Sequence, residues 1–494
     1  MIRWSVFRWT APVSLVALTC LFASSAAAAE RPNVLFIAVD DLNDWIGCLG
    51  GNSQCKTPNL DRLAARGVLF HQAHCAAPAC NPSRAALLTG VRPWTSGVYL
   101  NPQPWRPAMP DVVTMPQLFR QQGYHVIGGG KIYHGRYNDA KSWDSYLKGQ
   151  GDPKPDAKVA SDPHSRAGSI IWGRLHVDDE SMNDHRVVSW AVDYLGEQHD
   201  RPFFLACGIF RPHMPWQVPD KYYDQYPLDQ IELPKVLDDD LADVPGAGKR
   251  MAKPEGDHAT ILETDNWRHA VQGYLASIAF ADAQVGRLLD ALDSSPHKDN
   301  TIVVLWGDHG WHLGEKHHWR KFALWEEATR APLMIVAPGV TKPAVCRTPV
   351  DFMNIYPTLV DLCSLPAAKH CEGASLTPLL KDVDAAWERP AVTTHGRGNH
   401  AVRDPRWRYI RYEDGSEELY DHQQDPNEWK NLAGVEEHAD VKRRLAKWLP
   451  TEEAPNAAFD QNLQEGGNQK AKKKSKQKAK GKAKQGQGKA KQAS

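Results

Sequence analysis

Val34-Leu35-Phe36-Ile37-Ala38-Val39-Asp40-Asp41 joins an unbroken apolar run to two adjacent carboxylates. Six successive apolar residues are typical of a strand that is buried on both faces of a parallel sheet. Helical patterns at 181–198 and 267–292 separate this run from later ones. The alternation of strands and helices predicts a doubly wound α/β fold. We expect its sheet to contain residues 34–39, 124–127, 203–209, 301–306, 333–337 and 391–394.

Carboxylates come directly after two of these predicted strands. Asp40-Asp41 follows the first strand, and Asp308-His309 follows the strand at 301–306. Because doubly wound sheets bind ligands beyond the carboxyl ends of their strands, we expect these residues to lie together. Adjacent carboxylates repel one another unless a cation neutralises them. The set predicts a hard divalent ion, for which Ca²⁺ fits better than zinc, although the softer ligand His309 leaves the identity of the metal open.

Lysines and histidines follow other predicted strands in the same way. Lys131 and His134 come after the strand at 124–127 and three glycines. His213 follows the strand at 203–209 between two prolines, and Lys321 lies in Trp319-Arg320-Lys321. Isolated lysines are usually solvated, and isolated histidines usually fill core or surface positions. Their placement after buried strands favours a role in a site instead.

A reactive cysteine is indicated by Cys80-Asn81-Pro82-Ser83-Arg84. Proline is tolerated in the first turn of a helix, so the motif places Cys80 at the start of a short helix. The free N–H groups and the dipole favour an anion there, and Arg84 can reach back from the next turn. The pattern fits either an activated thiolate or a cysteine that is chemically converted before use.

This motif resembles the Cys-x-Pro-Ser-Arg signature of the type I sulfatases, and Leu88-Thr89-Gly90 also fits that family. In that family the cysteine is oxidised to Cα-formylglycine by a formylglycine-generating or sulfatase-maturing enzyme, and the hydrated aldehyde is the nucleophile. The resemblance spans about residues 32–450. It implies an alkaline phosphatase/sulfatase-like mixed sheet and the hydrolysis of sulfate esters. Within the family, the chain most resembles iduronate-2-sulfatases and their bacterial polysaccharide-degrading relatives. This likeness rests on Asp308-His309-Gly310-Trp311 and Arg211-Pro212-His213.

The resemblance also implies a role for each candidate residue. Lys131 and Lys321 are expected to bind sulfate oxygens, and Arg84 to add positive charge. His134 is expected to hydrogen-bond formylglycine, and His213 to protonate the leaving oxygen. The implied ligands of the divalent ion are Asp40, Asp41, Cys80, Asp308 and His309.

The organisation of the 494 residues suggests four segments. Residues 1–29 are expected to be a secretion signal, since Arg3 and Arg8 precede an apolar stretch and four alanines. Nothing else approaches a membrane span, so a periplasmic or secreted protein is predicted. A catalytic domain is expected over 30–385 and a smaller C-terminal α+β subdomain over 386–452. Residues 453–494 are expected to be a disordered, lysine-rich tail.

The tail and the cysteines leave several possibilities open. Eleven lysines and no acid lie between Lys470 and Lys491, although the whole chain has no net charge. The tail is either simply solvated or a tether to a polyanion; a nucleic-acid partner is not expected for a secreted protein. Cys363–Cys371 is the best candidate disulfide, and Cys48–Cys55 is a weaker one.

Three other functions compete with sulfate ester hydrolysis. A phosphodiester or phosphonate monoester hydrolase could share the fold and the signature. A secreted glycan-binding protein could use the site with Cys80 unconverted, and a cysteine hydrolase could use its thiolate. A sulfated carbohydrate, containing uronic acid or another sugar, is the expected substrate, and the 18 tryptophans would suit stacking on sugar rings.

Overall fold

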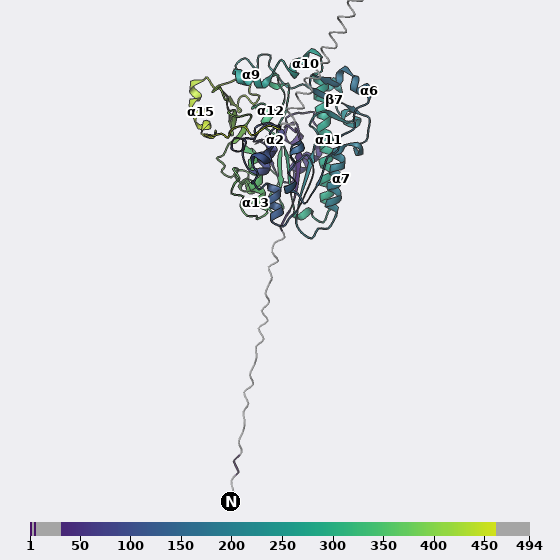
Figure 1. The fold of residues 1–494 in the computed structure, drawn as a ribbon, viewed down its shortest axis with the longest axis vertical. Helices are drawn as coiled ribbons and strands as arrows, with labels where there is room; N and C mark the ends of the chain where they lie inside the picture. Colours follow the sequence, from purple (N-terminus) through teal and green to yellow (C-terminus); the bar gives the residue numbers. More distant parts are fainter. Residues whose placement is uncertain (2–3, 6–30, 461–494) are drawn as a thin grey trace, which may run out of the picture. The chain divides into compact units, whose positions relative to one another are not determined.

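The computed structural model describes residues 1, 4–5 and 31–460. A mixed sheet of eight strands forms the centre of the fold (Figure 1). Most neighbouring strands are parallel, but β13 is antiparallel to both β10 and β2. The predicted doubly wound mixed sheet is therefore confirmed. In spatial order its strands are β14 (Ala344–Cys346), β2 (Val68–Phe70), β13 (Leu333–Val336), β10 (Thr301–Gly307), β1 (Asn33–Val39), β8 (Phe203–Ile209), β4 (His125–Gly130) and β5 (Ser145–Leu147).

Strand β1 lies in the middle of the sheet because both of its faces are apolar. Leu35 and Ile37 pack into one cluster, whereas Val34 and Phe36 pack into the cluster on the opposite face. Each such side chain contributes about 1.5–3 kcal/mol when it is fully buried. In Figure 1 the helices of the first face lie to the right and those of the second to the left. The first face is covered by α7 (Asn183–Gly196) and α11 (Trp267–Ser294), the second by α2 (Cys80–Thr89), α5 (Met115–Gln121) and α13 (Ile355–Leu362).

The C-terminal subdomain is built on a second, antiparallel sheet in the order β16-β17-β18-β19. One face packs on α15 (Ala439–Ala446) through Leu445, and the other packs on Trp325 and neighbouring residues. The prediction that residues 391–394 join the main sheet is wrong. They form β16, which pairs with β17 through a short connection, so local pairing replaces a long crossover. The strands are β16 (Ala391–Thr394), β17 (His400–Arg403), β18 (Trp407–Arg411) and β19 (Glu417–Asp421).

Residues 454–460 do not belong to a disordered tail. They run beside residues 94–102, where backbone N–H groups of Ala454 and Ala457 donate to carbonyls at 2.7 and 2.8 Å. The Tyr99 hydroxyl donates to the Ala454 carbonyl at 2.8 Å. This pairing holds the segment against residues 94–102. The predicted secretion signal (apart from residues 1 and 4–5) and the lysine-rich segment lie outside the described residues.

Neither predicted disulfide is formed. Cys48 and Cys55 are both free thiols, and Cys371 is a free thiol as well. Cys371 packs against Gly90 at the end of α2, where an added Cβ would meet its sulfur. Cys363 is buried at the end of α13. Within the described part of the chain, no helix combines the length and apolarity that a membrane span requires.

Candidate active site

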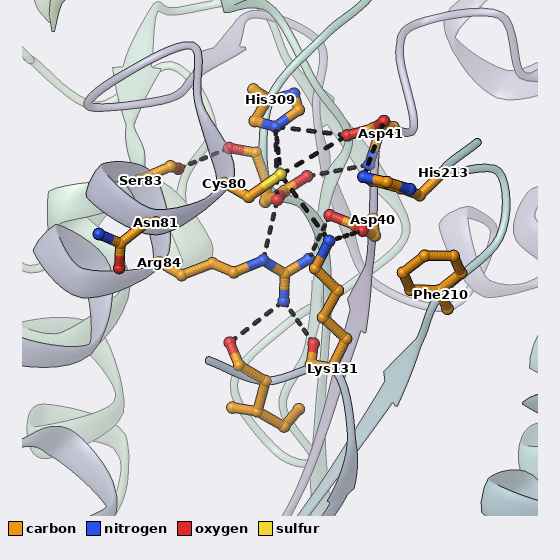
Figure 2. A network of polar contacts seen from close by, with 12 residues as sticks. Asp40, Asp41, Cys80, Asn81, Ser83, Arg84, Lys131, Phe210, His213 and His309 are labelled. Atoms are coloured by element: carbon orange, nitrogen blue, oxygen red, sulfur yellow. Dashed lines mark hydrogen bonds and ion pairs between the residues drawn. The ribbon is translucent and has the colours of Figure 1, made fainter. Parts of the chain in front are cut away.

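The candidate residues meet beyond the carboxyl ends of the central strands. Asp40 and Asp41 follow β1, and Asp308 follows its parallel neighbour β10. The Asp41 N–H donates to Asp308 Oδ1 at 3.0 Å, which joins the two strand ends. Lys131 follows β4 and His213 follows β8, so they enter from the other side of β1. Figure 2 shows these side chains converging around the sulfur of Cys80.

Cys80 is the first residue of α2 and is fully buried. Its Sγ lies 3.3 Å from His309 Nε2 and 3.2 Å from Lys321 Nζ. Lys131 Nζ is 3.8 Å away. Burial and the Asp40 carboxylate oppose the thiolate, but the two ammonium groups outweigh them, so the pKa of Cys80 lies below its ordinary value. The sulfur therefore occupies a position that favours a negative charge.

Five side chains around this position could hold a metal ion. One potential ligand atom from each lies within 4.8 Å of all the others. Asp41 Oδ2 is buried and accepts no hydrogen bond among the described residues. Burial raises the pKa of Asp41 to about 7 despite the nearby Lys321 ammonium. An orphaned carboxylate oxygen among other acids fits a hard divalent cation. The five residues are those predicted: Asp40, Asp41, Cys80, Asp308 and His309.

Arg84 fixes two of these carboxylates. Its Nε donates to Asp308 Oδ2 at 2.8 Å, and another guanidinium nitrogen donates to Asp40 Oδ1 at 3.0 Å. The third nitrogen donates to the carbonyls of Lys131 and Ile132. Because all three nitrogens have partners, the planar guanidinium orients the carboxylates as well as neutralising them. Ser83 Oγ adds a bond to the Asp308 carbonyl at 2.5 Å.

The two lysines approach Cys80 from opposite parts of the chain. Lys321 Nζ lies 2.6 Å from Asp41 Oδ1, and Lys131 forms an ion pair with Asp40. Burial opposes both ammonium charges, but the aspartates outweigh it, so the pKa values of both lysines are raised. Phe210 was not predicted from the sequence. Its ring lies 5.0 Å from Lys131 Nζ and 4.6 Å from the ring of His213 (Figure 2).

The three histidines differ in their surroundings. Burial opposes the imidazolium of His309, but the Asp308 carboxylate outweighs it and raises its pKa to about 9. Burial and Lys131 lower the pKa of His134 to about 3 and hold that of His213 well below its ordinary value. His213 Nε2 lies 3.9 Å from Asp41 Oδ2. His134 Nδ1 is buried and has no partner within the described part of the chain.

The loop that carries Lys321 is anchored to the C-terminal subdomain. Lys316 is buried, and its Nζ lies 2.6 Å from Asp240 Oδ1 and donates to the Glu428 carbonyl. His318 contacts the Lys321 carbonyl at 2.8 Å and the Ala252 carbonyl at 2.7 Å. Lys316 could not be singled out from the sequence, because a buried lysine cannot be distinguished from a solvated one without its partner.

Two family models match this chain. The sulfatase family matches residues 32–365, and the family described as "N-sulphoglucosamine sulphohydrolase, C-terminal" matches residues 314–454. A protein from Formosa agariphila named "Sulfatase" is 42% identical over 87% of this chain and 88% of its own length. The "Iduronate 2-sulfatase" of Mus musculus is 30% identical over 71% of this chain and 73% of its own length.

Solved structures support the fold. A 2-O GAG sulfatase has a TM-score of 0.65 and 24% identity, and covers 84% of this chain and 90% of its own. A phosphonate monoester hydrolase from Silicibacter pomeroyi has a TM-score of 0.71 and 22% identity, and covers 84% of this chain and 94% of its own. The fold is thus shared by enzymes with different substrates, whereas the sequence relatives are sulfatases. This chain belongs to the sulfatase family and is a sulfuric ester hydrolase.

Proposed function

We propose that this enzyme removes sulfate from a uronic-acid-containing or similar carbohydrate, using a formylglycine derived from Cys80 and a bound Ca²⁺. The observation that carries the proposal is the position of Cys80, which lies between two buried ammonium groups and the carboxylate cluster. The similar iduronate 2-sulfatase and 2-O GAG sulfatase are named for sulfate on a uronic acid or a glycosaminoglycan. A sulfated uronate is therefore the first substrate class to test.

The proposed conversion of Cys80 has a chemical reason. A formylglycine would supply a gem-diol, one hydroxyl of which attacks sulfur while the other permits the later release of sulfate. An unconverted cysteine or a serine would stay sulfated. The two lysines lie beside position 80 and would bind the sulfate oxygens, where negative charge develops. Arg84 would act through Asp40 and Asp308, which it holds in place.

Proton transfer is assigned to the two histidines beside the lysines. His213 would donate a proton to the departing alcohol, and His134 or Asp308 would accept one when sulfate leaves. Burial and Lys131 hold the pKa of His213 well below its ordinary value, which favours the neutral imidazole. A bound sulfate ester adds negative charge, which favours the imidazolium. We therefore propose that His213 takes up its proton together with the substrate.

The same site defines the proposed metal. The carboxylates of Asp40, Asp41 and Asp308, together with His309 and the group at position 80, would hold Ca²⁺. The cation would supply a positive charge that orients and polarises the sulfate group. Ion pairs fix the positions of these carboxylates. Arg84 pairs with Asp40 and Asp308, and Lys321 pairs with Asp41.

Metal removal should destabilise the protein as well as inactivate it. After treatment with a chelator, adding Ca²⁺ at about a hundred times its dissociation constant should stabilise the fold by about 3 kcal/mol. Thermal denaturation with and without Ca²⁺ measures this effect, and turnover of an aryl sulfate measures activity. Mg²⁺ and Zn²⁺ serve as comparison ions. If neither the melting temperature nor the turnover changes with the chelator or with added Ca²⁺, the proposed metal is wrong.

Two measurements test the function itself. The peptide containing residue 80, taken from protein made with a maturing enzyme, should be lighter than the cysteine form because an aldehyde replaces the thiol. The matured protein should hydrolyse an aryl sulfate faster than the matching aryl phosphate. A second candidate, hydrolysis of phosphonate or phosphate esters, is favoured by the shared fold with the phosphonate monoester hydrolase. The reverse preference, or an unconverted but active thiol, would contradict the proposal.

Export is part of the same proposal. We propose that residues 1–29 direct the protein to the periplasm or outside the cell, where a polysaccharide substrate would be found. A formylglycine-generating or sulfatase-maturing enzyme would act on Cys80 before the chain folds, because the thiol is fully buried in the folded protein.

A further inference from the structure

A cavity of about 430 Å³ lies next to the loop that carries Lys321. Phe322, the next residue, lines this cavity, and its ring lies 5.8 Å from Lys321 Nζ. The remaining walls come from two other parts of the chain, so the cavity opens between the catalytic domain and the C-terminal subdomain. They include Arg250 and Lys253 at the end of α9 (Gly246–Ala252), and His395, Asn399, Glu413 and Asp414 of the C-terminal subdomain.

Opposite walls of the cavity pack against one another. Ala247 and Ala252 of α9 share an apolar cluster with Ile410 and Tyr412 of the C-terminal sheet. The ring of Phe322 lies 6.0 Å from that of His395. These contacts hold the two sides of the cavity together, and Phe322 lies between it and Lys321 of the candidate active site.

Lys253 is the distinctive residue of this cavity. It ends α9 with φ 52° and ψ 56°, a left-handed conformation that glycine adopts without strain and that lysine rarely does. Its side chain is exposed and forms no ion pair with any described residue. By contrast, Arg250 is partly neutralised by Asp414 at 3.2 Å. Lys253 therefore presents an unpaired ammonium group to the cavity.

His395 adds an unsatisfied polar group beside Lys253. Its Nδ1 is buried and has no hydrogen-bond partner among the described residues. Burial lowers the pKa of His395 to about 4, so the ring that lines the cavity is a neutral imidazole. Phe322 offers an aromatic face to a sugar ring. A second cavity, of about 640 Å³, continues the hollow past Arg250 and Lys253.

We propose that Lys253, His395 and Phe322 form a subsite for an anionic substituent on the sugar next to the one that loses sulfate. The subsite rests on the proposed carbohydrate function and narrows it to substrates of at least two sugars with a second negative group. That group is a sulfate or a carboxylate, either of which would pair with the Lys253 ammonium. A monosulfated monosaccharide or a small aryl sulfate would leave the subsite empty.

The test compares Lys253→Met with the control Lys298→Met on four substrates. Lys298 is also exposed but precedes β10, at the opposite end of the sheet from the site. The substrates are an aryl sulfate and three disaccharides with the same scissile sulfate, whose second sugar carries a sulfate, a carboxylate or no charge. In the unaltered enzyme, a negative group on the second sugar should lower KM about tenfold. Lys253→Met should abolish this preference and leave aryl sulfate turnover unchanged, whereas Lys298→Met should keep both.

The outcomes separate the subsite from the function on which it rests. The subsite would be overturned if the unaltered enzyme had equal KM values for the three disaccharides. It would also be overturned if Lys253→Met and Lys298→Met preferred the charged disaccharides equally. In either case, turnover of the aryl sulfate would still support the proposed sulfatase activity. The charged disaccharide that shows the preference identifies the group as sulfate or carboxylate. Titration calorimetry with the desulfated charged disaccharide needs no turnover. If Lys253→Met lost binding of this disaccharide and Lys298→Met kept it, the subsite would be supported even if the sulfatase proposal failed.

Discussion

Replacing Cys80 with alanine should lower kcat for an aryl sulfate by about 10⁴-fold or more, because the proposed nucleophile is removed while the surrounding charges remain. The substitution removes only one sulfur atom from a buried position, so we expect the fold to persist. Its melting temperature should stay close to that of the unaltered protein. Steady-state kinetics and thermal denaturation together distinguish loss of chemistry from loss of structure.

Cys48→Ala is the matched control for this experiment. Cys48 is a partly buried free thiol that contacts Asp61, outside the candidate active site. Its replacement should leave kcat within a few-fold of the original value. Substantial turnover by the Cys80 variant would show that another group attacks sulfur. Alkylation of thiols should also spare the matured enzyme, since the proposed nucleophile is no longer a thiol.

Replacing Lys321 with methionine should lower kcat/KM by about 10²–10³-fold, the usual effect of removing one donor that stabilises transition-state charge. Lys321 Nζ is 3.2 Å from the sulfur of Cys80 and 2.6 Å from Asp41. The variant therefore loses a contact with the proposed sulfate position and part of the neutralisation of Asp41. Kinetics at saturating Ca²⁺ separate these effects, because added cation compensates only for the second.

Lys298→Met is again a suitable control, because it removes the same charge at the opposite end of the sheet. Its kcat/KM should not change. If Lys321→Met lost less than about tenfold at saturating Ca²⁺, the proposed contact with sulfate would be contradicted. A loss restored fully by higher Ca²⁺ would instead assign Lys321 to supporting the metal ligands.

Much of the fold could be predicted because its central strands carry a strong local pattern. The runs at 203–209 and 301–306 appear as β8 and β10 almost unchanged, since a strand buried on both faces must be apolar throughout. The direction in which each strand runs could not be predicted in the same way. Residues 333–336 form an apolar strand that runs antiparallel to β10, and such a run reads the same in either direction. Strands of three residues, such as β2, show no periodicity at all.

The site could be predicted to the extent that its residues follow strand ends. Asp40, Asp308 and Lys131 meet because β1, β10 and β4 lie in one sheet with parallel neighbours. Phe210 and Lys316 could not be found, because their importance comes from contacts with residues distant in the chain. The ion pair between Lys316 and Asp240, for example, joins positions separated by 76 residues.

The anchoring of Lys316 bears on how chimeric sulfatases should be designed. The second family match begins at residue 314, within the loop that carries Lys321, rather than near residue 386. A graft that exchanged only residues 386–452 would replace the carbonyl of Glu428 that accepts from Lys316. Recombination upstream of Gly314 would transfer the loop and its anchor together, and so keep the Lys321 ammonium beside position 80.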